Sequence, residues 1–294
     1  MLRQLASPAA LVASVLLGLP AVSHGADYRI GVFAGTASEN EQRELRGTYQ
    51  PLVDYLAKAT GNSMTLEVSQ SLDDMDRNLD AGRYTIFLGP THVTADAIED
   101  GYAPVAKWDQ PLYSLFIVPA GSPYRTIANL RGARLGIASR DTAVGPLCVG
   151  ALNKAGLRAD ENLASVYEGK FQDVMSRALV DGHLDAICTG PAAWKALSRQ
   201  APGKFRVIGE SVRVPGFALS IDTRLSEPEK QRLARILVGI GRTPDGRRAL
   251  AAITGSATGA VDTLRTSARE YAAANVLIES NRRMYDVQIP RSLP

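Results

Sequence analysis

Short apolar runs alternate along the chain with longer stretches in which apolar residues recur every three or four positions. The runs at 28–33, 64–68 and 84–88 have the length of buried strands, and the two stretches between them have helical spacing. The first stretch is expected to form one helix, or two helices that break at Pro51. This strand–helix–strand order predicts a parallel sheet with helices on its faces.

The same order starts again in the middle of the chain. Four further strands are expected at residues 113–118, 133–138, 164–167 and 185–189. A last strand at 217–221 is followed by a remainder that is mostly helical. Two similar α/β units are therefore predicted. Because no Gly/Ser-rich or Pro-rich linker separates them, we expect short crossing segments that act as a hinge between two lobes.

Polar residues mark several helix starts. Ser38 with Glu41, and Ser226 with Glu229, have the spacing of a capping box, in which each side chain bonds to the backbone N–H of the other residue. Ser71 is expected to cap a third helix.

Residues 1–26 are typical of a secretory signal peptide. Arg3 precedes an apolar run at 9–19, and small residues lead up to Asp27. The run is shorter than the roughly 20 residues that a membrane span needs, which disfavours the alternative of a retained membrane anchor. We expect cleavage near Gly25 or Ala26 and a mature protein in the periplasm, an oxidising compartment.

Composition and charge narrow the function classes. The chain has 33 Lys and Arg against 30 Asp and Glu, and its basic residues are spread out in ones and twos. A stripe able to neutralise a row of phosphates is not visible, so nucleic-acid binding is disfavoured. With 294 residues, 45% of them hydrophobic, the chain is long enough for two folded domains.

Motifs of the common enzyme classes are missing from the mature chain. It contains no HExxH, GxSxG, GxxxxGK[ST] or GxGxxG pattern. We therefore expect a binding protein that is not an enzyme and that uses no cofactor and no metal.

Four segments of the mature chain resemble one protein family, in the right order. They are residues 49–56 (YQPLVDYL), 88–90 (LGP), 127–132 (IANLRG) and 243–250 (TPDGRRAL). Together they are similar to the phosphate/phosphonate-binding, PhnD-like periplasmic proteins of ABC transporters. The resemblance covers nearly all of the mature chain and is carried by the order and spacing of the segments, since no single one is diagnostic.

The resemblance implies a type II periplasmic-binding fold, which is α/β with two lobes. Lobe 1 would combine residues 27–114 and 217–294, lobe 2 would span 115–216, and one small anionic or zwitterionic solute would bind in the cleft between them. The protein would then be a monomer that delivers this solute to an ABC permease. The alternative is a receptor that binds arsenite or another oxyanion and presents its closed form to a membrane histidine kinase.

Candidate ligand contacts lie where strands end, because ligands of open α/β sheets bind at the carboxyl ends of the strands. Small or hydroxyl residues occur there at 35–38, 89–92, 139–145 and 189–190, beside helix starts whose N–H groups suit an oxyanion. Any single Ser or Thr could equally be a helix cap. The two tyrosines of the candidate set are expected to wall the cleft or to belong to the core. The candidates are Thr36, Tyr49, Thr91, His92, Tyr113, Arg140, Asp141, Thr142, Ala143 and Thr189.

Departures from the family bear on the ligand. Phosphonate-binding relatives carry a Ser-Thr-Ser-Gly-like run where this chain has residues 141–145 (DTAVG), so one or two hydroxyl donors are missing. Asp141 would repel an anion unless Arg140 or an amino group of the ligand offsets its charge. His92 is a substitute donor in a loop where relatives often carry an aromatic residue. The sequence therefore disfavours a plain phosphonate.

The two cysteines, Cys148 and Cys188, are expected at the same end of lobe 2. A disulfide between them would stabilise the fold by roughly 4 kcal/mol in the chain-entropy model. Two alternatives stay open: separate buried thiols, or a thiol pair that grips a soft ion or an arsenite-like oxyanion together with His92. The last alternative follows from the resemblance, since some relatives are thought to sense arsenite through Cys.

Overall fold

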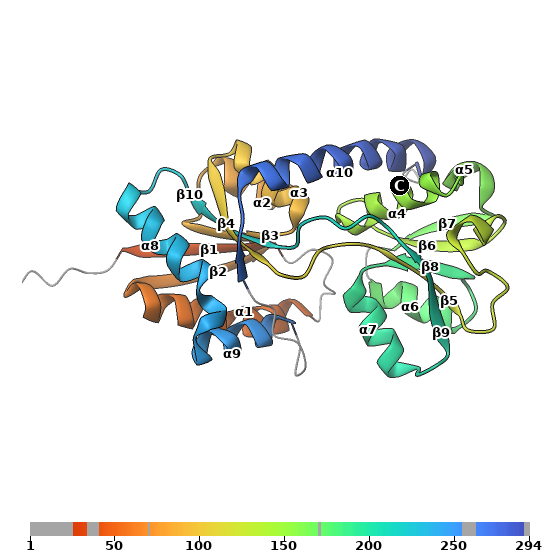
Figure 1. The fold of residues 1–294 in the computed structure, drawn as a ribbon, viewed down its shortest axis with the longest axis horizontal. Coiled ribbons are helices and arrows are strands. Elements are labelled where there is room, and N and C mark those ends of the chain that lie inside the picture. Colours follow the sequence, from red (N-terminus) through yellow and green to blue (C-terminus); the bar gives the residue numbers. More distant parts are fainter. Residues whose placement is uncertain (1–25, 34–40, 70, 170–171, 255–262, 291–294) are drawn as a thin grey trace, which may run out of the picture.

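Two β-sheets stand side by side, and helices cover the faces of each (Figure 1). The computed structural model describes residues 26–33, 41–69, 71–169, 172–254 and 263–290. The arrangement confirms the prediction of two α/β units in one chain. The predicted signal peptide lies outside the described residues up to its last position, Ala26.

The first unit is built on a six-stranded sheet. Its strands are β1 (Asp27–Phe33), β2 (Ser63–Ser69), β3 (Ile86–Gly89), β4 (Tyr102–Trp108), β10 (Ala218–Asp222) and β11 (Thr263–Arg265). The spatial order is β11-β4-β10-β3-β1-β2. β1 is parallel to β2 and β3, whereas β10 runs antiparallel to β3 and β4, and β11 runs antiparallel to β4.

Five helices complete the first unit, and apolar side chains pack them against both faces of the sheet. They are α1 (Glu41–Thr60), α2 (Leu72–Asp80), α3 (Thr91–Glu99), α8 (Glu227–Val238) and α9 (Pro244–Thr254). One core contains side chains of α1, α8 and α9, and the other contains side chains of α2 and α3. A short 3-10 helix, η2 (Ile240–Arg242), joins α8 to α9.

The second unit is built on a five-stranded sheet in the order β7-β6-β8-β5-β9. Its strands are β5 (Leu115–Pro119), β6 (Arg134–Ala138), β7 (Ser165–Gly169), β8 (Ala186–Thr189) and β9 (Phe205–Glu210). β6 is parallel to β7 and β8, and β5 is antiparallel to β8 and β9. Its helices are η1 (Ile127–Leu130), α4 (Val144–Lys154), α5 (Ala159–Asn162), α6 (Gln172–Val180) and α7 (Pro191–Gln200).

Three strands, β4, β9 and β11, are absent from the sequence-based prediction. β4 contains Pro104, which lacks an N–H and normally argues against a paired strand. In the structure the pairing of β10 with β4 shifts register between Leu219 and Ser220, and Ser220 lies opposite Pro104. Such a bulge tolerates proline because the ladder is already interrupted there. α1, by contrast, runs unbroken through Pro51, so the single-helix alternative is the correct one.

The predicted helix caps have mixed outcomes. The Ser71 side chain accepts a hydrogen bond from the N–H of Asp74, which confirms that cap. The capping box of Ser226 and Glu229 is wrong, because the Ser226 side chain makes no cap bond and the Glu229 carboxylate accepts a hydrogen bond from the Tyr28 hydroxyl. The tertiary partner has displaced the local one. The Ser38–Glu41 prediction starts outside the described residues.

Two short segments, residues 109–114 and 211–217, carry the chain between the units. They run side by side, and Leu112 and Val214 exchange two backbone hydrogen bonds of 2.9 Å. A Cβ atom on Gly216 would lie 2.2 Å from the carbonyl oxygen of Gln110, so the two segments approach this closely only because residue 216 is glycine.

The last helix, α10 (Ala268–Gln288), extends over both units (Figure 1). It packs against α3 of the first unit and α4 of the second. Its C-terminal residues Tyr285 and Ile289 belong to the core of the second unit. Among the described residues, no helix is both long and apolar enough to cross a membrane.

Candidate functional site

The loop that follows β3 in the first unit touches the loop that follows β6 in the second. His92 stands in the first turn of α3, and its Nε2 atom lies 3.2 Å from the carbonyl oxygen of Asp141. Two of the predicted strand ends, one from each unit, therefore meet. This contact lies at the carboxyl ends of parallel strands, where open α/β sheets bind their ligands.

The His92 imidazole is a neutral group inside this contact. His92 is 1% exposed, and its ring meets the Phe33 ring edge-on, with 6.3 Å between centroids. Burial, together with the positive charge of Arg282, lowers the pKa of His92 to about 3. Because a carbonyl oxygen only accepts, Nε2 carries the hydrogen, and the buried Nδ1 holds a lone pair without a partner.

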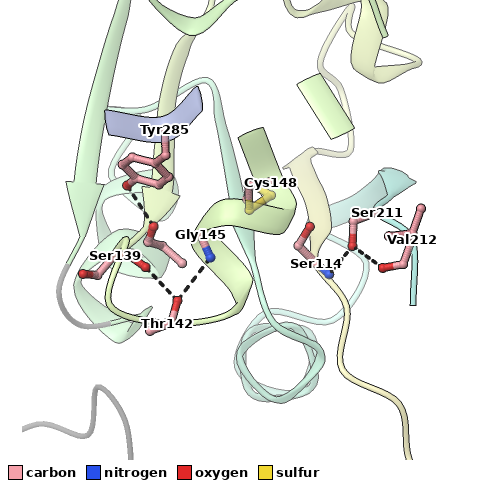
Figure 2. The surroundings of a disulfide bond; sticks show 10 residues. Ser114, Ser139, Thr142, Gly145, Cys148, Ser211, Val212 and Tyr285 are labelled. Atoms are coloured by element: carbon pink, nitrogen blue, oxygen red, sulfur yellow. Dashed lines mark hydrogen bonds between the residues drawn. A yellow bond between two sulfur atoms is a disulfide. The ribbon is translucent and has the colours of Figure 1, made fainter. Parts of the chain in front are cut away.

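The hydroxyl groups of the two candidate threonines bind the backbone. Thr91 is buried and its Oγ1 donates to the carbonyl of Pro215 in the second crossing segment. Thr142 Oγ1 donates to the Ser139 carbonyl at 2.7 Å and accepts from the Gly145 N–H at 3.1 Å (Figure 2). Each hydroxyl hydrogen is thus already donated within the protein, which is the helix-cap alternative for Thr142.

Arg140 is nearly fully buried, and its guanidinium points into an ion cluster. Its donors reach both carboxylate oxygens of Glu168, at distances down to 2.6 Å, Asp286 Oδ1 at 2.6 Å and the Ile289 carbonyl at 2.8 Å. The guanidinium carbon also lies 4.9 Å from the centroid of the Tyr285 ring. The structure therefore uses Arg140 to hold the protein together, in a geometry unlike that of a free anion-binding side chain.

Glu168 binds the same loop a second time. Its Oε1 atom accepts from the backbone N–H of Arg140 at 3.0 Å and from the Ser139 hydroxyl at 3.2 Å. Burial alone would raise the pKa of Glu168, but the hydrogen bonds and charge of Arg140 outweigh it and lower that pKa. An internal carboxylate thus occupies donors that the sequence assigns to a ligand.

Asp141 is exposed, and only its backbone takes part in this network. Its N–H donates to the Ser139 hydroxyl at 3.2 Å, and its carbonyl accepts from His92. Within the described part of the chain the Asp141 carboxylate has no ion pair, because Arg140 is bound to Glu168 and Asp286 instead. The negative charge of Asp141 is therefore exposed and has no ion-pair partner among the described residues.

The remaining candidates lie in less polar surroundings. Tyr49 is 8% exposed in the core of the first unit, and burial raises its pKa to about 12. The Tyr113 ring packs at the edge of the second core with the Arg213 guanidinium 4.3 Å above it. Ala143 and Thr189 are buried. Thr36 lies outside the described residues.

A disulfide joins Cys148 in α4 to Cys188 in β8 (Figure 2). Both residues are completely buried, and their Cα atoms are 6.0 Å apart. Of the three arrangements considered for the cysteines, the structure contains the disulfide. It ties α4, which follows the Thr142 loop, to the strand that ends at Thr189.

Three helix starts surround the meeting strand ends. The N-cap residues are Pro90 for α3, Ala143 for α4 and Gly190 for α7, and none of them makes a side-chain cap bond. Backbone N–H groups at such starts carry a partial positive charge that favours an anion. The described residues contain no group of three or more His, Cys, Asp or Glu side chains that could hold a metal ion.

Sequence reasoning missed Glu168 and Asp286. Glu168 follows a predicted strand directly, so the rule that flagged the other strand ends could have included it. Asp286 has no such signal, because it stands in a helix far away in the sequence and meets Arg140 only in the folded chain.

Comparison with known proteins gives one family. A family model described as the periplasmic substrate-binding protein of a phosphonate ABC transporter matches residues 34–265. The fold is similar to that of a binding protein component of an ABC phosphonate transporter from Pseudomonas aeruginosa, with 14% identity, a TM-score of 0.69 and coverage of 90% of this chain and 89% of that one. No curated protein matches the chain.

A second solved structure has a similar fold. PhnD1 from Prochlorococcus marinus, in complex with methylphosphonate, has 12% identity and a TM-score of 0.71, with coverage of 86% of this chain and 97% of that one. At such identities the likeness concerns the fold. It confirms the predicted α/β fold of the type II periplasmic binding proteins, and the family model confirms the predicted resemblance.

Proposed function

Because the chain belongs to the family of periplasmic substrate-binding proteins of phosphonate ABC transporters, we propose that it captures one small phosphonate-like solute between its two units and delivers it to an ABC permease. The family consists of transport proteins and not of enzymes, and it is a periplasmic family. The predicted signal peptide supports the same location.

The arrangement of the units supports a closing motion around the solute. Two short crossing segments, 109–114 and 211–217, connect the sheets and touch at Gly216. Short paired segments suit a hinge that bends while each sheet stays rigid. A solute that contacts both units binds better in the closed form, so it shifts the population towards closure.

The observation that carries the proposal is the contact of His92 with the Asp141 carbonyl. It brings the starts of α3 and α4 together from different units. The start of α3 has no side-chain cap, and at the start of α4 the Thr142 hydroxyl caps only the Gly145 N–H, so both helix starts supply N–H donors for phosphonate oxygens. The lone pair on His92 Nδ1 is an acceptor, which suits a ligand that carries an N–H or O–H group.

The charge of Asp141 favours a zwitterion over a plain anion. Arg140 does not offset that charge, because Glu168 and Asp286 neutralise it. An ammonium group on the solute would pair with Asp141 while its phosphonate group faces the helix starts. We therefore propose an aminoalkylphosphonate as the ligand class.

Calorimetric titration of the mature protein tests this proposal. The panel is 2-aminoethylphosphonate, methylphosphonate, inorganic phosphate and ethanesulfonate. We expect 2-aminoethylphosphonate to bind most tightly, and Asp141→Asn to reduce its advantage over methylphosphonate by roughly 5-fold, since an ion pair contributes about 1 kcal/mol. Asp109→Asn, which removes an exposed carboxylate from the crossing segment, is the matched control. Failure of every phosphonate to bind would overturn the proposal.

Deletion of the gene for this protein distinguishes a role in transport from a role in sensing. Loss of the protein should abolish uptake of the radiolabelled solute in the source organism while transcription of the transport genes still responds to it. The reverse result would favour the receptor alternative, in which the closed form signals to a histidine kinase.

A further inference from the structure

The helix α10 makes a third connection between the units, in addition to the two crossing segments. It starts next to the hinge, where the Tyr271 hydroxyl donates to the Gly216 carbonyl at 2.8 Å. From there it passes over α3 and α4 (Figure 1). When the units separate, α10 must therefore stay with one of them and slide over the other.

The side of α10 that meets the second unit is closely packed. A Cβ atom on Gly150 of α4 would lie 2.3 Å from the side-chain nitrogen of Asn281, so only glycine allows this approach. Ile278 is completely buried against α4. The Tyr285 hydroxyl donates to the Ala138 carbonyl at 3.0 Å, and Gln288 accepts from the Ala159 N–H at the same distance.

The side of α10 that meets α3 is charged and incompletely bonded. The Nε and Nη2 atoms of Arg282 are buried without a hydrogen-bond partner. Arg282 lies close enough to Asp96 and His92 of α3 to act on both through its charge, and its ion pair, at 2.8 Å, is with Glu279 of its own helix. Within the described part of the chain, no hydrogen bond or ion pair joins α3 to α10.

This contrast decides which interface opens. Separating α10 from α4 would expose apolar side chains and break satisfied hydrogen bonds. Separating it from α3 would instead let water reach polar atoms that now lack partners, which recovers their solvation. The interface with α3 is therefore the weaker one.

We propose that Arg140 is a positioning residue that fastens the carboxyl-terminal end of α10 to the β6–α4 loop, so that α10 moves with the second unit and slides over α3. The Arg140 guanidinium binds Asp286 and the Ile289 carbonyl at the end of α10. Its own backbone belongs to the loop that contacts His92. The proposal rests on the two-unit motion of the proposed function and not on the identity of the ligand.

The proposal changes the division of the chain. The sequence-based boundaries place all of 217–294 in lobe 1. The first turn of α10 stays with the first unit, because Glu270 forms an ion pair with Lys107 of β4. The rest of α10 and the residues after it join the second unit, which becomes 115–216 plus 272–290. The second unit thus includes a helix that the order of elements along the chain assigns to the first unit.

Spin-label distances test which unit α10 follows. Both native cysteines are in the buried disulfide, so introduced cysteines are labelled selectively. The label sites are the exposed positions Val276→Cys in α10, Val180→Cys in the second unit and Arg235→Cys in the first. Distances are measured in pairs, without ligand and with methylphosphonate or 2-aminoethylphosphonate.

We name each distance distribution by the two labelled positions. The expected result is a narrow distribution of distances between labels 276 and 180 in every condition. The distribution between labels 276 and 235 should be as broad as that between labels 180 and 235. A narrow 276–235 distribution beside broad 276–180 and 180–235 distributions would overturn the proposal and leave the two-unit motion intact. Three narrow distributions that no ligand changes would overturn both.

Variants then test the role of Arg140. Asp286→Asn removes one exposed partner and should broaden the 276–180 distribution, with Asp245→Asn as the control because it removes a surface carboxylate of the first unit. Arg140→Gln should broaden it further, and Arg140→Lys should restore part of the narrow distribution. If Arg140→Gln does not fold, Asp286→Asn decides: an unchanged distribution in that variant contradicts the positioning role.

Discussion

The two loops that meet at the candidate site are held in place by different chemistry. In the second unit, the loop before α4 is fixed by an ion cluster around Arg140 and by the Cys148–Cys188 disulfide just beyond it. In the first unit, the start of α3 is held by neutral groups: the buried imidazole of His92 and the Thr91 hydroxyl. Only one side of the site is cross-linked.

This difference shows that protein groups can take up all the directed bonds of a charged residue in a candidate binding loop. Arg140 is the only arginine among the candidate residues, yet its donors are directed at protein carboxylates and a carbonyl. The loop then offers a candidate ligand only backbone N–H groups and the charge of Asp141. The second unit should therefore respond most to lost cross-links. The α3 side should respond to pH once one of its two titrating groups, His92 or Asp96, is replaced.

The largest expected effect is loss of the disulfide. Replacing both Cys148 and Cys188 by Ala should lower the free energy of unfolding by about 4 kcal/mol, because the unfolded chain regains the entropy of a long loop. Urea unfolding measures it, with one tryptophan in each unit as a reporter: Trp194 in α7 for the second and Trp108 in β4 for the first.

We expect the Trp194 transition to move to lower urea by more than the Trp108 transition. A loss below about 1 kcal/mol would contradict the cross-link as a source of stability. Thiol titration of the wild-type protein under denaturing, non-reducing conditions is the control, and two reactive thiols per chain would show that the disulfide is absent.

The ion cluster should give the next largest effect. Glu168→Gln leaves the buried Arg140 with Asp286 as its one ionic partner, and it should destabilise the protein by about 3 kcal/mol. The value is at the low end for buried pairs because the Glu168 side chain is 26% exposed. The matched control is Asp185→Asn, which removes the partner of the more exposed Arg134 in the same unit and should cost less than about 1 kcal/mol. Equal losses of stability in Glu168→Gln and Asp185→Asn would mean that the ion cluster around Arg140 stabilises the protein no more than a surface ion pair does.

Acid should act on the other side of the site, through two groups of α3 with opposite effects. Burial and Arg282 lower the pKa of His92 to about 3 in the folded state. Between pH 6 and pH 4 the imidazole is therefore protonated only in the unfolded state, and the free energy of unfolding decreases as the pH is lowered. Burial and the nearby Asp76 raise the pKa of Asp96 to about 6, so in that window the folded state takes up the proton and stability rises as pH falls.

The two contributions nearly cancel in the wild-type protein, and single variants separate them. Relative to wild type, Asp96→Asn should lose about 1.5 kcal/mol of stability between pH 6 and pH 4.5, and His92→Gln should gain slightly more than that. Denaturant unfolding at a series of pH values measures the slopes. Parallel curves for wild type and both variants would show that neither group titrates differently on folding.

The sequence predicts the frame of the site better than its contacts. Apolar runs with Gly, Pro and hydroxyl residues behind them place the loops at 89–92 and 139–145 correctly, because strand ends follow from local patterning. The partners of Arg140 do not follow, since Glu168 and Asp286 are separated from it by 28 and 146 residues. Such pairs depend on how α10 lies over the second unit, which no local pattern encodes.

The missed strand β4 and the wrong cap at Glu229 have a similar cause. Pro104 argues locally against β4, and only its pairing opposite the bulge in β10 makes the strand acceptable. Glu229 has the spacing of a cap, but the distant Tyr28 hydroxyl binds it instead. In each case a tertiary contact overrides a correct local rule.

The smallest expected effect comes from substitutions of Thr142. They test whether its hydroxyl caps a helix or contacts the ligand. Its hydroxyl donates to the Ser139 carbonyl and accepts from the Gly145 N–H, so Thr142→Ala should cost about 1 kcal/mol of stability while Thr142→Ser retains most of it. Affinity for 2-aminoethylphosphonate, measured by calorimetry well below the melting temperature, should change less than about 2-fold in both variants, because under 0.5 kcal/mol of binding energy is at stake. A loss of affinity in Thr142→Ala that Thr142→Ser reverses, without a matching loss of stability, would mean that the hydroxyl leaves its carbonyl partner and turns to the ligand when the units close.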